Sequence, residues 1–469
     1  MWKVIAAELR DSWSAWLGVS LGFVMTGFGL TLAALVMQSS LGARELIPEM
    51  ESDAYTIIGG SNLLLCVVVG LSVVGAGTSL VLDSRRGAVA RLGLAGATPS
   101  GVVGSQLYQL AAVAVASAVV ADLFAIAALR PALDYLQAER GADSAGIAVP
   151  AVVEPGTLVA VNLLWVAVVL VGGLRQARRA SRIPPVEALR QSQGAEPTRT
   201  RSVARWVRAV LASLIVLGMF AIVPVLAANR GRETFTQIMQ LNLFGLVVVG
   251  WLLAELMPSI VRPLTAVWTG VIPATAAPQW WLARATVLAR AQRLTRSVTP
   301  VMFTCGLAFG VLGLPATYNA IFAANGVDVE LEHVGAATFL VNLGMPLAIA
   351  MCGSVGSLFM MSKQRTAELA LLGIAGATPG QRTGAATAEA VIVTGTAALL
   401  GLVMVGVSFA HLAYATPASG FGFALAVPVL PFLVALLVTG GITVATTVVP
   451  TLSGRRLPEP RVIARLVTE

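Results

Sequence analysis

The chain has 469 residues, of which 57% are hydrophobic and 12% charged, and its mean hydropathy is +0.83. Soluble globular domains carry about 25% charged residues, so this composition excludes the soluble classes and indicates an integral membrane protein. The net charge is +8. No aromatic residues interleave with the basic ones to form a nucleic-acid groove, so we expect contact with anionic membrane lipids and no nucleic-acid partner.

Ten apolar runs are long enough to cross a bilayer as helices, which predicts an all-α polytopic membrane protein with about ten transmembrane helices. The first run is longer than a signal-peptide core and follows Arg10 and Asp11, so we interpret it as a retained span. The predicted spans are Leu17–Met37, Ile57–Leu82, Val102–Leu129, Val152–Leu174, Arg208–Ala228, Met239–Val261, Val298–Tyr318, Ala336–Met361, Thr383–Ala410 and Ala424–Pro450.

The basic residues predict the orientation. With both termini in the cytoplasm, most of the 31 Lys and Arg residues fall in inner loops and tails, as the positive-inside rule requires. Acidic residues gather instead in the outer loops, for example at residues 45–53 and 328–332. The basic residues that remain outside are Arg44, Arg130, Arg140, Arg230 and Arg232.

Two nearly identical octapeptides, Leu92–Pro99 and Leu372–Pro379, stand 280 positions apart and indicate an internal duplication. The same offset pairs Arg85 with Arg365, and Arg10 with Arg290. We therefore expect two parallel four-helix repeats in a 4+2+4 arrangement. An even number of spans between them gives both the same orientation, which counts against the inverted-repeat transporters. The predicted divisions are a first repeat at 1–190, a linker with two extra helices at 191–279, and a second repeat at 280–469.

Each octapeptide is predicted to form a tight corner between two helices. The second span of each repeat is predicted to continue as a helix beyond the membrane, and Gly96 or Gly376 is suited to end it in the left-handed conformation. Thr98-Pro99 and Thr378-Pro379 then suit an N-cap followed by proline at the first helical position. A mere hairpin between spans is the alternative. The repetition of the sequence favours docking of a two-fold partner on the two corners.

The segment Arg365–Thr378 resembles the signature loop of FtsX-like ABC permeases, the MacB-type or type VII group. The tail Arg178–Arg190 is similar to the basic Pro-x-Glu-Ala-Leu-Arg ending of that domain, and the amphipathic leaders Met1–Trp16 and Trp281–Arg296 also fit. The resemblance covers roughly four-fifths of the chain. The second tail, Gly454–Arg461, matches only loosely.

The resemblance implies a permease of the bacterial plasma membrane, with two copies of a separate ABC ATPase that holds ATP-Mg docked on the corners. Its expected activity is export or extraction of a hydrophobic or membrane-active compound such as a lipid, an antibiotic or a peptide. MacB-type members usually carry a large outer domain, whereas Gln38–Thr56 and Asn319–Gly335 are short, so their substrates do not carry over. The implied ATPase-coupling residues are Arg85, Arg86, Arg91, Gly93, Gly96, Thr98, Pro99, Arg365, Glu368, Gly373, Gly376, Thr378 and Pro379.

No enzyme site is expected in this chain. It has no Gly-x-x-x-x-Gly-Lys-Ser/Thr phosphate loop, so ATP hydrolysis requires another polypeptide. A His-Glu-x-x-His motif is also missing from the sequence, and no nucleophile elbow is expected. The three cysteines are well separated within predicted spans, which suits small buried side chains and neither a disulfide framework nor a metal site.

Ionisable groups within spans are functional candidates: Asp122, Glu255 and Glu389, the last matched by Gln109 at the repeat offset. One interpretation is that these groups form interhelical hydrogen bonds that fix the packing, or, for Glu255, a local pair with Arg262. The other is that they line a substrate or proton pathway. An ion-coupled transporter would use Asp122 or Glu389. A further alternative is an ATPase-coupled mechanotransmitter that regulates a cell-wall hydrolase or sensor kinase without transport.

Overall fold

The computed structural model describes residues 13–44, 49–84, 96, 98–139, 149–181, 203–227, 231–273, 277–327 and 334–454, and these ranges contain helices and no strand. Nine helical stretches within them are long and apolar enough to cross a membrane. The protein is therefore a multi-pass helical membrane protein. The helices that supply these stretches are α2 (Trp13–Gly42), α3 (Glu49–Ser84), α5 (Pro99–Glu139), α8 (Val203–Ala221) with the short α9 (Val223–Leu226), α10 (Arg232–Thr269), α12 (Ala291–Ala324), α13 (Ala336–Met360), α15 (Pro379–Ala415) and α16 (Val429–Gly454).

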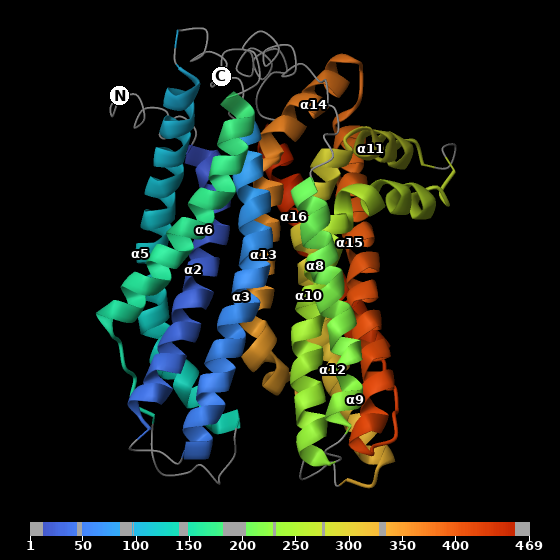
Figure 1. Ribbon diagram of the computed structural model, residues 1–469. Coiled ribbons are helices and arrows are strands. Elements are labelled where there is room, and N and C mark those ends of the chain that lie inside the picture. The colour runs from blue at the N-terminus through green and yellow to red at the C-terminus, as the bar shows by residue number, and fades with distance from the viewer. Residues whose placement is uncertain are drawn as a thin grey trace.

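The remaining predicted span coincides with α6 (Pro155–Ser181), whose described apolar stretch, Pro155–Val171, is shorter than the others. Two short helices, α11 (Pro278–Ala289) and α14 (Ser362–Ile374), lie at the same end of the long helices (Figure 1). A 3₁₀ turn, η2 (Thr416–Ser419), follows α15.

Most helices are longer than the predicted spans, because hydropathy marks only the apolar part of a helix. The span predicted to end at Leu129 continues in α5 to Glu139 through Ala, Leu and Gln residues, which favour helix in a polar setting as well. The expected leader Trp281–Arg296 is divided at Arg290, where φ is −116° and ψ is 58°, into α11 and the start of α12.

Two sets of four helices have the same pattern of neighbours. In one set α2 packs against α3, α5 and α6, and α6 also contacts α3 and α5. In the other set α12 packs against α13, α15 and α16, and α16 also contacts α13 and α15. Large apolar side chains are exposed on the outer helices, with Leu163 67% and Leu437 73% exposed, as expected for surfaces that face lipid.

Helices α8 and α10 pack against each other and against α15. The buried His411 of α15 connects them: the Asn242 side-chain amide donates to Ser408 O at 2.8 Å and lies 3.2 Å from His411 Nδ1. His411 Nε2 lies 3.3 Å from the carbonyl oxygen of Met219. This set of partners fits a neutral imidazole that accepts at Nδ1 and donates from Nε2, so His411 serves as a packing residue that holds the extra helices.

The two sets meet where α13 packs against α2 and α3. A Cβ atom on Gly356 would lie 2.1 Å from the carbonyl oxygen of Gly18, and one on Gly353 would lie 2.3 Å from Val73 Cγ1. The backbones of α2 and α13 are thus in direct contact. Gly353 and Gly356 thus place α13 in close contact with α3 and α2, and Gly70, whose Cβ would meet Thr26 at 2.4 Å, does the same between α3 and α2.

Candidate functional site

The corner after α14 has the predicted geometry. Gly376 has a φ of +94°, in the left-handed region that glycine tolerates best. The Gly376 N–H donates to Gly373 O at 3.0 Å and the Ala377 N–H to Leu372 O at 2.9 Å, which is the Schellman pattern that ends a helix. In the other copy Gly96 has a φ of +88°.

The helix that follows is capped as predicted. Thr378 Oγ1 accepts from the Gln381 N–H at 3.3 Å, and the Gln381 side chain accepts from the Thr378 N–H at 2.8 Å, so Thr378 and Gln381 form a full capping box around Pro379 at the first helical position. In the other copy Thr98 Oγ1 accepts from the Gly101 N–H at 3.2 Å. Glycine stands there where the second copy has Gln381, so the reciprocal bond cannot form.

One element of the prediction is wrong: α13 does not continue unbroken into the corner. A turn at Met361 (φ −78°, ψ −7°) separates α13 from α14. The Met361 N–H still donates to Ser357 O at 3.3 Å, and α14 resumes with the Arg365 N–H donating to Met361 O. The break allows α14 to cross the end of the bundle (Figure 1), which places its residues over α12 and α15.

Arg365 is not a surface contact, because only 2% of its side chain is exposed. Its Nε and Nη2 atoms donate to the two carboxylate oxygens of Glu389 in α15 at 3.0 and 2.9 Å. A charge buried at this depth is tolerated only with a partner, and the guanidinium fork matches a carboxylate with two bonds. Glu389 thus gains a specific partner, while the coupling role implied for Arg365 stays a prediction in which its buried side chain does not itself touch the ATPase.

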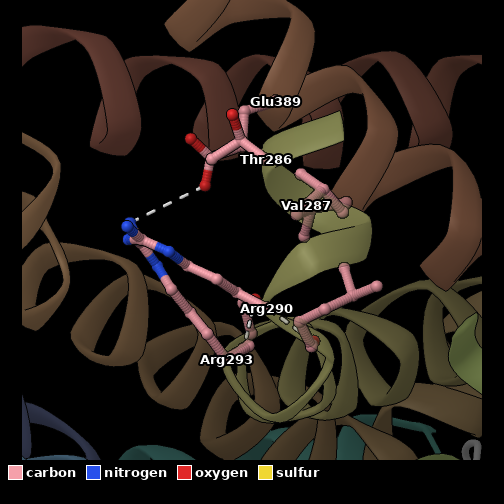
Figure 2. Close-up of a pocket in the computed structure, with 8 residues that line it drawn as sticks. Thr286, Val287, Arg290, Arg293 and Glu389 are labelled. Carbon is pink, nitrogen blue, oxygen red and sulfur yellow. Dashed lines mark hydrogen bonds and ion pairs between the residues drawn. The ribbon is translucent and has the colours of Figure 1, made fainter. Parts of the chain in front are cut away.

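The same carboxylate lies near a second arginine. Arg293 Nη2 of α12 is 3.7 Å from Glu389 Oε1, and Arg293 Nη1 donates to Glu368 Oε1 of α14 at 2.8 Å. Arg290, at the junction of α11 and α12, also pairs with Glu368. Figure 2 shows Arg290 and Arg293 pointing together toward Glu389 across a small cavity. We call the five residues Arg290, Arg293, Arg365, Glu368 and Glu389 the charge cluster.

The charge cluster carries three positive and two negative charges from three helices, α12, α14 and α15, and from the junction of α11 and α12. Its geometry joins α14 to the start of α12 and to α15. Not every donor is used: Arg293 Nε and Arg365 Nη1 are buried without a hydrogen-bond partner. Buried polar groups of this kind are costly to leave unpaired, so removal of either carboxylate should destabilise the whole cluster.

The outer face of the corner is apolar, a feature that our sequence reasoning missed. Leu371 and Ile374 of α14 are 59% and 60% exposed, although they follow a buried Ala370. They are three residues apart and so lie on one face of the helix. The sequence did contain a signal for this face, namely two apolar residues spaced three apart. Because the helix is expected to lie outside the membrane, lipid would not cover them.

Four predicted coupling residues, Arg85, Arg86, Arg91 and Gly93, lie outside the described residues.

The polar residues predicted within the spans lie in the part of the chain that the structure describes. Asp122 accepts hydrogen bonds from Thr31 Oγ1 at 3.0 Å and Asn162 Nδ2 at 2.6 Å, which joins α2, α5 and α6. Gln109 is buried in α5, with 1% of the residue exposed. These contacts favour the packing interpretation.

The predicted pair of Glu255 with Arg262 is wrong. Glu255 of α10 pairs instead with Arg208 of α8, whose Nη2 donates to Glu255 Oε2 at 2.9 Å. Residues seven apart are two helical turns from each other, too far for a direct pair, whereas three or four residues would suit one. Glu255 therefore joins the two extra helices.

Fold and site together define a multi-pass helical membrane protein with a capped corner, apolar on its outer face and tied by buried charges on its inner face. Among the described residues no group of His, Cys, Asp or Glu side chains is arranged to hold a metal ion. No family model matches the chain, and no curated protein sequence matches it.

Proposed function

We propose that this chain is the permease subunit of an ABC transporter, in which a separate ATPase drives export or extraction of a hydrophobic or membrane-active compound. The observation that carries the proposal is the corner at α14. A short capped helix presents apolar Leu371 and Ile374 outward, while Arg365 and Glu368, in its earlier turns, connect to α15 and α12. A docked protein that displaces α14 would therefore also displace the two long helices α12 and α15.

The helix packing supports a two-unit arrangement. The shared pattern of neighbours in the sets α2, α3, α5, α6 and α12, α13, α15, α16 is what a duplicated four-helix unit would produce. In this proposal the chain has ten spans in a 4+2+4 order, with cytoplasmic termini and corners. Two copies of the ATPase dock on it, one at each corner, because the parallel repeats present both corners on the same side.

The substrate route follows from the same architecture. The described outer segments are short, so the compound is recognised within the membrane or at its rim. Lipids, antibiotics and amphiphilic peptides partition there. Lateral access from the bilayer is the simplest path.

Co-purification with a candidate ABC ATPase tests the docking role of α14. The test variant is Leu371→Asp with Ile374→Asp, and the matched control, Leu371→Met with Ile374→Leu, keeps both positions apolar. We expect the wild type and the control to retain a stoichiometric ATPase, and the Asp variant to lose at least tenfold in affinity because two desolvated anchors become charged. Retention by all three would place docking elsewhere, and no ATPase with the wild type would refute the proposal.

The same complex distinguishes transport from force transmission. In proteoliposomes, ATP-dependent movement of a labelled lipid or drug supports the permease role. ATP hydrolysis without such movement, together with binding of a cell-wall hydrolase or sensor kinase, would instead support a mechanotransmitter. Uptake driven by a proton gradient without any ATPase would support an ion-coupled carrier that uses Asp122 or Glu389.

A further inference from the structure

The charge cluster has no counterpart in the first repeat. At the offset of 280 residues, Arg293 corresponds to Trp13, Glu368 to Ala88 and Glu389 to Gln109, and only Arg290 and Arg365 are matched, by Arg10 and Arg85. Both carboxylates are missing there. Ion pairs equivalent to Arg365–Glu389, Arg293–Glu368 and Arg290–Glu368 therefore cannot form at the corresponding positions of the first repeat.

In the second repeat those pairs are the charged connection between the corner and the start of α12. The backbone of α14 packs against α13, α15 and α16, and Glu368 extends its contacts to Arg290 and Arg293. Arg365 adds a two-bond pair to Glu389 in α15. Arg293, Arg365 and Glu389 are at most 15% exposed, so loss of one of them leaves its partner a charge that water screens little.

We infer that the two corners are mechanically unequal, and that the charge cluster makes α14 move as one body with α12 and α15 in the second repeat alone. This inference rests on the proposed function for its role in coupling, and on the structure alone for the local rigidity. A displacement applied at the second corner reaches α12 and α15 through side-chain ion pairs. The matched positions of the first repeat, Ala88 and Gln109, carry no carboxylate that could form such pairs.

Hydrogen exchange of the intact protein in lipid nanodiscs tests the rigidity without any ATPase. The variant Glu368→Gln with Glu389→Gln removes both carboxylates, and at residue 389 it installs the amide that the first repeat carries at Gln109. We expect the amides of Ser362–Ile374 to exchange at least tenfold faster, a larger acceleration than that of the amides of α2 and α10. A fold-retaining variant whose α14 amides exchange at the wild-type rate would overturn the inference.

Two further variants separate local rigidity from general stability. Asp122→Asn and Gln109→Ala remove buried polar groups from α5 and should leave the exchange of α14 unchanged. Should the Gln variant unfold, Arg365→Met with Glu389→Met carries the test, since this double variant leaves neither member of the pair buried alone. Wild-type exchange of α14 in that variant, or equal acceleration by Gln109→Ala, counts against the inference.

Substrate-stimulated ATP hydrolysis tests the coupling role separately from the rigidity of α14. In complex with the ATPase, the cluster variants should bind with wild-type affinity and lose at least tenfold of the substrate-stimulated part of ATP hydrolysis, while Gln109→Ala keeps it. Unaltered stimulation in the cluster variants would reject the coupling role. If no ATPase binds the wild type, the proposed function fails while faster exchange in α14 still supports the local rigidity.

Discussion

Glu389 is a carboxylate within an otherwise apolar helix, and its environment explains how it is tolerated. Its side chain is 15% exposed and receives two hydrogen bonds from Arg365, with Arg293 a further 3.7 Å contact. Opposite charges held in fixed geometry offset the loss of water that burial imposes. A group that is paired in this way stabilises the corner rather than offering a free proton carrier.

Glu389→Gln should therefore destabilise the protein strongly, by about 3–5 kcal/mol, because it leaves Arg365 buried and without its charge partner. Replacement of both residues, Arg365→Met with Glu389→Met, should cost less. Unfolding in detergent, followed by heat or denaturant, measures both. Asp134→Asn is the control, since its pair with Arg130 is about half exposed and worth less than about 1 kcal/mol. Equal effects of Glu389→Gln and Asp134→Asn would contradict the buried-pair account.

The sequence could reveal Glu389 as a polar residue in a span, and it could not reveal the partner. Arg365 and Glu389 are brought together by the bend at Met361 and by the reach of a long side chain, neither of which local patterns encode. One signal was present, however. Between the two repeats Arg293, Glu368 and Glu389 are all replaced by uncharged residues, and the joint change of opposite charges is what contacting groups would show.

At the scale of elements, the corner could be predicted well because its geometry depends on local residues. Glycine ends α14, and Thr-Pro begins α15, for reasons confined to a few positions. The positions of the long helices were also predictable from hydropathy. The break at Met361 was not, because Met360-Met361-Ser362 contains neither glycine nor proline and the bend depends on what α14 packs against.

Gly376→Ala tests the corner by changing only backbone preference. A Cβ atom at Gly376 would meet no atom within 4 Å, so any cost comes from its φ of +94° and should be about 1–2 kcal/mol. Gly380→Ala is the matched control: it also has open space, it lies in α15, and it should be neutral or slightly stabilising. The same unfolding assay applies. A neutral Gly376→Ala would argue against the left-handed corner.

At the scale of the whole molecule, the contact between α2 and α13 should set how closely the two helix sets approach. Gly356→Ala places a methyl group against the carbonyl oxygen of Gly18, so we expect a loss of about 1–3 kcal/mol from overpacking. Gly406→Ala, at an open position of α15, is the control and should not destabilise. A spin-label distance between α2 and α13 should lengthen only in the first variant. No change in that distance would contradict a contact through backbone.

The contact between Gly18 and Gly356 also limits which motions are available to the molecule. Gly353, one turn before Gly356 in α13, continues this contact, because a Cβ atom on Gly22 would lie 3.8 Å from the Gly353 Cα atom. Separation of α2 from α13 at this point would therefore expose the backbone of both helices. Relative motions of the two helix sets that retain this backbone contact avoid that cost, and motions that break it do not.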